Sequence, residues 1–341
     1  MECVPRHIGP PPAPHREERP AYRRQAESTD INYTVNECPG QSNCKSSPKL
    51  TMKVSHATLA LLSAVRGTAH SHAPVQARQE APEPRGTGPY AASWTTDPTL
   101  GNHTIFAPAD IPADLKLPVI VWGQTGCSYN GLRFEDFLIE VASHGVLILA
   151  NGVPGGQDNP NGIGETSNPD SSLHLQALDW ITEGEGVEAY PSADTSRIAA
   201  AGQSCGGIQA YSVAGDERVT ALGIFNSGMI DASSPIPGSV TQPIFYFLGG
   251  PTDIAYENGE RDYTNLPPET PKWKGNLPLG HMGDYGEENG GKFGVAASSW
   301  AKWILRGNET SAAFFLEGGA EEDGWEAVHE GLEELDVPSL D

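Results

Sequence analysis

The residues best suited to do chemistry lie at positions 202–206, where Gly-Gln-Ser-Cys-Gly matches the pattern GxSxG. A strand-like apolar run, 197–201, precedes them, and a helix-like run, 207–213, follows. A sharp strand-to-helix turn with small flanking residues exposes the hydroxyl of its central serine. The pattern also arises by chance in ordinary glycine-rich turns, but this context predicts that Ser204 is a nucleophile.

A serine hydroxyl is a weak nucleophile, so it needs a histidine base and a carboxylate that holds the histidine in the right tautomer. Around such a turn the chain order is serine, acid, histidine. Only His281 and His329 follow Ser204. His281 lies in a glycine-flanked loop and His329 lies in an acidic tail, so we expect His281 to be the base rather than an ordinary loop residue.

The acid must come from the carboxylates between the serine and the histidine. Asp253 directly follows the turn after the apolar run 243–248. Side chains at the carboxyl ends of strands build the sites of α/β sheets, which favours Asp253. The alternatives are Asp231, after the preceding strand, and Asp262 or Glu257, which need a longer loop.

Acyl transfer places negative charge on the former carbonyl oxygen, which needs two fixed N–H donors. We expect one donor to be the backbone N–H of Cys205 and the other to come from residues 123–127, where Gln124 is the first candidate. An ordinary glycine-rich turn is the alternative for this loop. If both donors converge, Cys127 and Cys205 come close enough for a disulfide; otherwise Cys205 is a buried filler and Cys127 a free thiol.

Apolar patterning predicts strands alternating with helices. Strands separated by helices imply a mostly parallel sheet covered on both faces, within one α/β domain. The predicted strands are 117–122, 146–150, 197–201, 220–225 and 243–248, and the predicted helices cover 134–142, 173–181, 207–213 and 296–304.

The segment before this domain is typical of a targeting sequence. Residues 52–73 begin with Met-Lys, continue with the apolar run 57–65 and end in small residues, the order of a secretory signal peptide cleaved after Ala69 or Ala73. A single buried helix or a membrane anchor is the alternative, although the run is shorter than the about 20 residues that span a bilayer. Residues 1–51 are then a disordered leader or a gene-model extension.

The remaining chain divides by composition. We expect a mobile N-terminus over 74–98, the α/β domain over 99–317 and an acidic tail over 318–341. Three apolar side chains of that tail are able to pack back on the domain: Trp325, Val328 and Leu332.

Charge and cysteine content suit a secreted protein. The net charge is −23, and removal of residues 1–73 leaves 12 Lys and Arg against 38 Asp and Glu. Such a surface repels nucleic acid and anionic membranes, which argues against both as partners. The apolar run 57–65 is too short for a stable membrane anchor. Cys127 and Cys205 remain as a candidate disulfide in an oxidising compartment, and Asn102 and Asn308 lie in glycosylation sequons.

These residues together resemble secreted fungal α/β-hydrolases related in layout to dienelactone hydrolases, chlorophyllase-like esterases and cutinase-like polyester hydrolases. The resemblance covers about residues 117–305. It implies the α/β-hydrolase fold, a triad of Ser204, Asp253 and His281, and an oxyanion hole at the backbone of Gln124 and Cys205. Its motifs are Val-Ile-Val-Trp-Gly-Gln at 119–124, Ala-Ser-His-Gly at 142–145, the turn at 202–207, Gly-Gly-Pro-Thr-Asp at 249–253 and Gly280-His281.

Two departures from the resemblance bear on the substrate. Cys205 stands where polyester hydrolases usually carry a larger residue, and no aromatic residue follows Gly123. Ser204 stands where dienelactone hydrolases of the cysteine type carry a cysteine. These differences argue against polymers and dienelactones as substrates.

The expected activity is hydrolysis of small or lipid-like carboxylic esters through an acyl-Ser204 intermediate. Alternatives are a serine peptidase or acyltransferase on the same triad, or a non-catalytic extracellular binding protein. Neither HExxH nor GxxxxGK[ST] occurs, so we expect no metal or nucleotide cofactor. Four residues after strand ends are candidates for the substrate pocket, with the core as the alternative for each: Met229, Tyr256, Met282 and Tyr285.

Overall fold

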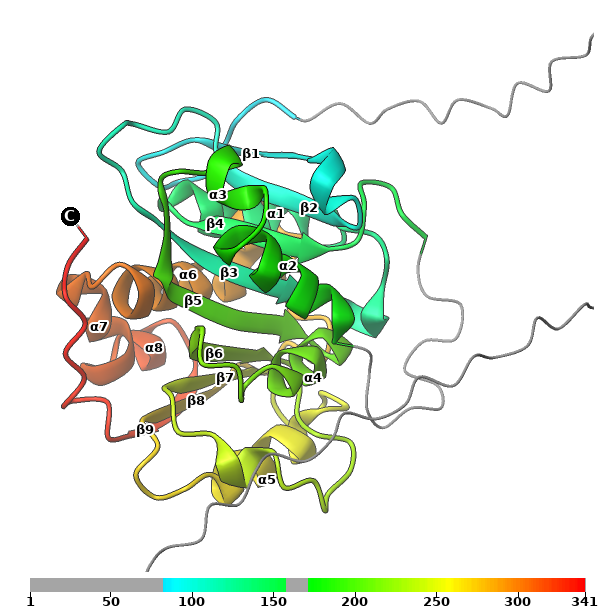
Figure 1. Cartoon of the computed structure of the whole chain (residues 1–341). Helices are drawn as coiled ribbons and strands as arrows, with labels where there is room; N and C mark the ends of the chain where they lie inside the picture. The colour runs from blue at the N-terminus through cyan, green and yellow to red at the C-terminus, as the bar shows by residue number, and fades with distance from the viewer. Residues whose placement is uncertain (1–81, 158–170, 341) are drawn as a thin grey trace, which may run out of the picture. The chain divides into compact units, whose positions relative to one another are not determined.

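The computed structural model describes residues 82–157 and 171–340, which all fall in the unit His72–Asp341. The expectations for residues 1–51 and 52–73 lie outside the described residues. The described strands form one nine-stranded sheet in the order β1-β2-β4-β3-β5-β6-β7-β8-β9 (Figure 1). The six strands from β4 to β8 in this order pair in parallel, whereas β1 with β2, β2 with β4 and β8 with β9 pair antiparallel.

The element bounds are as follows. The strands are β1 Ala92–Thr95, β2 His103–Pro108, β3 Leu117–Gly123, β4 Leu147–Asn151, β5 Ala193–Gln203, β6 Val219–Phe225, β7 Ile244–Leu248, β8 Lys272–Asn276 and β9 Glu326–Glu330. The helices are α1 Glu135–Ser143, α2 Ser172–Thr182, α3 Gly186–Ala189, α4 Cys205–Ser212, α5 Tyr256–Asn265, α6 Gly291–Trp300, α7 Glu309–Leu316 and α8 Gly319–Glu322.

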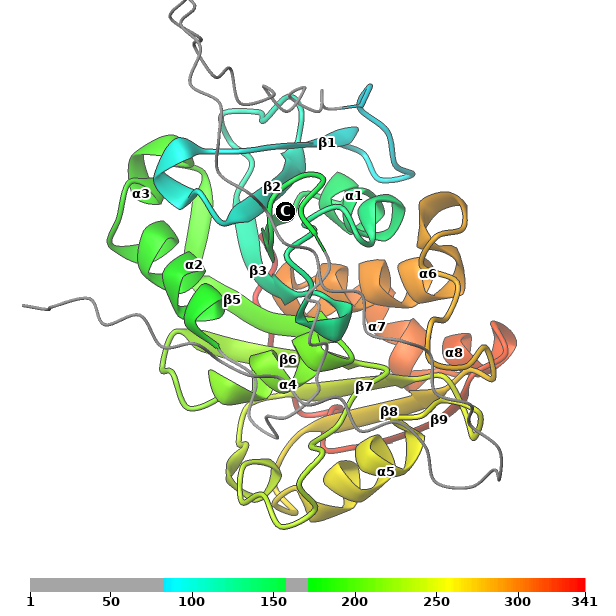
Figure 2. The ribbon, with the colours of Figure 1, turned by 90° about the vertical axis from the view of Figure 1, so that its right-hand side faces the viewer.

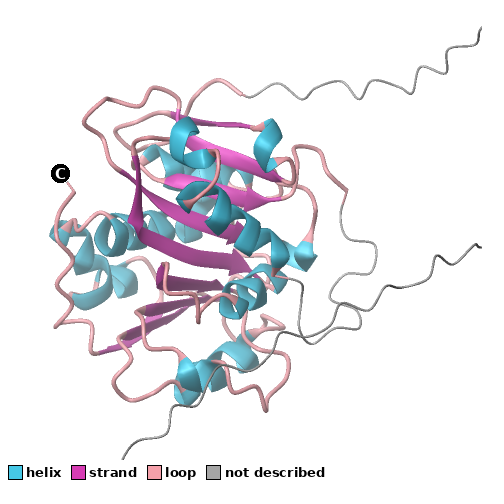
Figure 3. Ribbon diagram, viewed as in Figure 1, coloured by secondary structure: helices cyan, strands magenta, loops and turns pink. Residues whose placement is uncertain are grey.

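Helices cover both faces of the sheet, with α1 and α6 on one face and α2 and α4 on the other (Figures 2 and 3). Every side chain of β3, β4 and β7 is buried, as expected for central strands covered on both faces. Alternation along β7 divides its residues between the two cores: Phe245 and Phe247 on one face, and Ile244, Tyr246 and Leu248 on the other.

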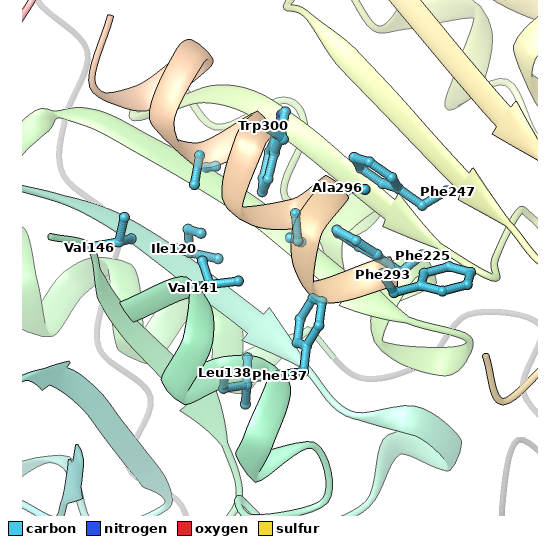
Figure 4. Close-up of a cluster of buried hydrophobic side chains, with 14 of the residues drawn as sticks. Ile120, Phe137, Leu138, Val141, Val146, Phe225, Phe247, Phe293, Ala296 and Trp300 are labelled. Atoms are coloured by element: carbon cyan, nitrogen blue, oxygen red, sulfur yellow. The ribbon is translucent and has the colours of Figure 1, made fainter. Parts of the chain in front are cut away.

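Aromatic packing holds the core between the sheet and helices α1 and α6 (Figure 4). Phe225 of β6 stacks on Phe247 of β7 with ring centroids 4.3 Å apart. Phe137 of α1 contacts Phe225 edge to face. Trp300 of α6 packs on Phe225 and Phe247. This core fixes the strand ends that carry the candidate site.

The α/β architecture and a mostly parallel sheet are confirmed. All five predicted strands exist, as do the helices predicted over 134–142, 173–181 and 207–213, with bounds that shift by a few residues. The helix predicted over 296–304 begins earlier, as α6, and its second half is the π-helical segment Ala301–Leu305. Four strands were not predicted from the sequence: β1, β2, β8 and β9. β8 reads Lys-Trp-Lys-Gly-Asn and β9 reads Glu-Ala-Val-His-Glu, so neither shows the apolar run of a central strand.

The ends of the domain differ from the expectation. Residues 92–95, expected to be mobile, form β1 and bury Ala92 and Trp94 against the core. In the acidic tail, β9 extends the sheet and Trp325 and Leu332 are buried, whereas Val328 is half exposed. Strand pairing thus holds both segments that composition alone assigned to the periphery.

The strand order reverses at β3. The chain passes from β3 to β4 on one side and then returns to β5 on the other side of β3. A site in an open α/β sheet usually lies at the carboxyl ends of the strands where the order reverses, so the ends of β3 and β5 are the place to look for one. No helix among the described residues is long and apolar enough to cross a bilayer.

Candidate active site

Ser204 lies at the carboxyl end of β5, in a sharp turn between β5 and α4. Its backbone has φ 56° and ψ −118°, a region that non-glycine residues rarely occupy. The flanking glycines allow β3 to pack against the turn, because a Cβ at Gly206 would lie 2.0 Å from the carbonyl oxygen of Gly123. The turn therefore presents the serine side chain at the strand end, as GxSxG predicts.

His281 and Asp253 complete a hydrogen-bonded row with Ser204. His281 Nε2 is 2.9 Å from Ser204 Oγ, and His281 Nδ1 is 2.6 Å from Asp253 Oδ1. Asp253 follows β7 and His281 follows β8. Strands β5 to β8 are parallel, so all three side chains lie at the carboxyl ends of the strands. The structure thus brings together the three residues that the sequence analysis selected.

Asp253 is buried and surrounded by donors. Its Oδ1 also accepts from the Ala255 N–H at 2.8 Å, and its Oδ2 accepts from the Gly249 N–H at 3.0 Å and from Asn226 Nδ2 at 2.9 Å. Burial raises the pKa of this carboxyl, but the hydrogen bonds from His281, Ala255, Asn226 and Gly249 outweigh it and lower the pKa below its ordinary value. The group is held as an anion beside the histidine.

The alternative residues lie in other surroundings. Asp231 is exposed and accepts from Ser233, and Glu257 is exposed on α5. Asp262 is buried, but it accepts from the Met229 N–H and pairs with Arg261. His329 lies in β9 at the edge of the sheet, where it contacts Glu333 at 3.0 Å.

The candidate oxyanion hole joins the loop after β3 to the start of α4. Cys205 is the first residue of α4, so its N–H has no acceptor within the helix. The Gln124 side chain is fully buried; it accepts from Trp122 Nε1 and donates to the Gly131 carbonyl. These contacts fix the Gln124 side chain, so only its backbone is suited to meet substrate.

Cys127 and Cys205 form a disulfide with their Cα atoms 5.2 Å apart. The bond joins residues 78 positions apart in sequence. It connects the β3 loop to the first residue of α4, the two segments that hold the expected donors. The disulfide that we expected if the Gln124 and Cys205 N–H groups converge is therefore present.

A cavity of about 170 Å³ opens beside Ser204 and His281. Four apolar side chains line it together with Ser227, Gly228 and Asn258: Ile208, Ile230, Ile254 and Ala255. Ile254 is 77 % exposed and Ile230 is 45 % exposed, so the mouth of this cavity is apolar.

The lining contains none of the four residues expected there. Met229 and Tyr285 are buried in the two cores, which corrects their placement, because a position after a strand end does not fix the direction of the side chain. Tyr256 is partly buried on α5, and Met282 is exposed next to His281.

Three polar residues of the site were missed by the sequence analysis. Gln203 donates to the His281 carbonyl at 2.6 Å, Ser227 donates to the Ser204 carbonyl at 2.6 Å, and Asn226 donates to Asp253. Gln203 occupies a variable position of GxSxG, and the other two directly follow β6. Their place after a predicted central strand was the available signal.

The two sequons lie at loops outside this site. Asn102 is exposed in the turn before β2. Asn308 precedes α7 and its side chain accepts from the Ser311 N–H at the start of that helix.

The sequence matches no known protein-family model, and no curated protein matches it.

Proposed function

We propose that the protein is a secreted serine hydrolase of the α/β-hydrolase fold that cleaves carboxylic esters. The observation that carries the proposal is the continuous row from Ser204 Oγ through His281 to Asp253, with contacts of 2.9 and 2.6 Å. A buried carboxylate, a histidine and a serine in this order are the parts that activate a hydroxyl for acyl transfer.

In the proposed reaction His281 Nε2 takes the proton of the Ser204 hydroxyl as the oxygen attacks the ester carbonyl. The N–H groups of Cys205 and Gln124 stabilise the resulting oxyanion. His281 then gives the proton to the leaving alcohol, which leaves an acyl-Ser204 ester. Water, deprotonated by His281, then attacks the acyl carbonyl. The bond from the acyl carbon to Ser204 Oγ breaks, His281 returns the proton to Oγ, and the carboxylic acid leaves.

The size and lining of the cavity define the proposed substrate. About 170 Å³ is less than the 300–1,000 Å³ typical of sites for drug-sized ligands. Isoleucine side chains form much of the wall, and no Asp, Glu, Lys or Arg lies among the residues that line it. We propose uncharged esters with a short apolar acyl or alcohol group.

A secreted location fits the Cys127–Cys205 disulfide, because such bonds persist in oxidising compartments. The proposal uses no metal or cofactor.

Hydrolysis of p-nitrophenyl esters tests the proposal, from acetate to long-chain esters, by the full chain and by Ser204→Ala. We expect turnover that is highest for short acyl chains and that is lost in Ser204→Ala. A fluorophosphonate should label the full chain and not the variant. Faster cleavage of peptides than of esters would indicate a peptidase. Absence of both turnover and labelling would overturn the proposal in favour of a non-catalytic binding protein.

A further inference from the structure

Behind Asp253 a buried chain of hydrogen bonds ends at a tyrosine hydroxyl. Asn226 Nδ2 donates to Asp253 Oδ2 at 2.9 Å and to the Gly280 carbonyl at 3.2 Å. Gly280 is the residue directly before His281. The Tyr285 hydroxyl in turn donates to Asn226 Oδ1. Each polar atom of the Asn226 side chain thus has a partner.

This arrangement permits only one orientation of the amide. If the Asn226 amide were flipped, its oxygen would face two acceptors, Asp253 Oδ2 and the Gly280 carbonyl. Burial and the nearby carboxylates of Asp253 and Asp284 raise the pKa of Tyr285 well above its ordinary value, so its hydroxyl stays protonated and donates. The two acceptors therefore set the orientation in which Asn226 donates to Asp253, and the tyrosine hydroxyl holds the amide there by donating to Asn226 Oδ1.

Asn226 shares two backbone features with Ser204 one strand away: a positive φ and an N–H that donates to the neighbouring strand. Asn226 follows β6 with φ 43° and donates its N–H to the Phe247 carbonyl at 2.7 Å. Ser204 follows β5 with φ 56° and donates to the Phe225 carbonyl at 2.9 Å. Glycine occupies such left-handed positions with less strain than any other residue. The chain nevertheless carries an asparagine here, and the asparagine amide is the group that contacts Asp253.

We propose that Asn226 and Tyr285 are positioning residues for the reaction: Asn226 holds the Asp253 carboxylate toward His281 Nδ1, and Tyr285 holds the Asn226 amide. This inference rests on the proposed function. Neither residue touches substrate. Both act through Asp253, which must stay fixed while His281 gains the serine proton.

Asn226→Gly gives a clean test, because glycine keeps the left-handed backbone and removes only the side chain. We expect kcat for the preferred p-nitrophenyl ester to fall about 10- to 100-fold, as for a misplaced catalytic group, with KM within about threefold. Loss of one donor leaves the Asp253 carboxylate less stabilised, so it binds the protonated imidazole of His281 more strongly. The acid limb of the pH–rate profile, which reports protonation of the base, should therefore move to higher pH. Asn289→Gly is the matched control, because Asn289 also has φ 56° but lies outside the site.

Tyr285→Phe tests the second residue by removing one hydroxyl. We expect kcat to fall about 3- to 10-fold, since loss of one neutral hydrogen bond is worth about 1 kcal/mol. The acid limb should shift in the same direction as in Asn226→Gly. Tyr246→Phe is the control; Tyr246 is equally buried and its hydroxyl contacts Tyr211 instead. Titration with a fluorophosphonate normalises every rate to folded, reactive protein.

The outcomes separate the two proposals. An active full chain, with both variants within twofold of its kcat and an unmoved acid limb, would overturn the positioning roles and leave the hydrolase intact. Equal losses in the variants and in their controls would indicate general destabilisation and would also overturn the inference. A full chain that neither turns over nor is labelled would overturn the proposed function and the inference together.

Discussion

The left-handed backbone at Ser204 turns the hydroxyl toward His281, at the expense of local strain of about 1–3 kcal/mol. Close packing of glycines holds this conformation. Cβ atoms at Gly202 and Gly123 would lie within 2.4 and 2.5 Å of the Gly206 backbone. The glycines of GxSxG therefore set the distance between the turn and the loop after β3, as well as allowing the turn itself.

Gly206→Ala should disrupt that distance. The added methyl group would meet the Gly123 carbonyl, so the backbone must move and the expected donors at Cys205 and Gln124 must separate. We predict a loss of stability of about 1–3 kcal/mol from overpacking and a 10²- to 10³-fold fall in kcat from loss of one oxyanion donor. Urea unfolding and ester turnover measure the two effects.

Gly215→Ala is the control for this substitution, because no atom lies within 4 Å of a Cβ built at Gly215. It should change the free energy of unfolding by no more than about 0.5 kcal/mol and leave kcat unchanged. Equal behaviour of the two variants would contradict the packing argument.

Sequence alone predicted the site residues that a motif or the order of residues along the chain specifies. Ser204, Asp253 and His281 follow from a motif, a strand end and the scarcity of later histidines. Asn226 and Tyr285 did not follow, because a hydrogen bond between residues 59 positions apart depends on how β6 and the loop after β8 meet. Met229 and Tyr285 were expected in the pocket and lie in the core, since strand-end position does not specify side-chain direction.

At the scale of elements the disulfide joins the β3 loop to α4. We predict that the double variant Cys127→Ala, Cys205→Ala loses about 2–4 kcal/mol of stability and that its kcat falls, because the loop is free to withdraw the Gln124 N–H. Urea unfolding and ester turnover check both. A reducing agent should lower activity in the parent and have no effect on the double variant; loss in both would contradict a role for this bond.

Predicted and missed strands differ in their surroundings. The five predicted strands are all parallel and buried on both faces or nearly so, which produces continuous apolar runs. The missed strands lie toward the two edges of the sheet. β9 alternates exposed with half-buried side chains, and two of its three exposed residues are glutamates. Charged edge strands of this kind discourage pairing with other chains. Such sequences are indistinguishable from polar loops until a partner strand is known.

At the scale of the whole molecule two buried histidines predict acid sensitivity. Burial lowers the pKa of His103 and of His174 from 6.5 to about 4. Below pH 6.5 these two histidines bind protons in the unfolded chain, whereas in the folded protein they stay neutral until the pH falls to about 4. Stability should therefore decline over this window by up to about 1.4 kcal/mol per pH unit for each histidine, and it should be insensitive to these groups above pH 6.5.

Urea unfolding from pH 7.5 to 4 measures this decline. The double variant His103→Gln, His174→Asn keeps the neutral hydrogen-bonding atoms, because His103 uses Nε2 and His174 uses Nδ1. It should show a shallower slope. Measurements in about 1 M salt, where the Debye length is about 3 Å, remove the contribution of the net charge of −23. An unchanged slope in the variant would contradict the assignment.

The place of β5 in the sheet has a consequence for how the protein opens. Among the described strands β5 is the fifth of nine, with four on either side. Fraying that begins at β1 or β9 has to cross four strand pairs before it reaches the residue before Ser204. Amide hydrogen exchange should therefore slow from both edges toward β5. The central position of β5 thus protects the proposed nucleophile from local unfolding that starts at the edges of the sheet. A molecule frayed at either edge would still carry an intact nucleophile turn.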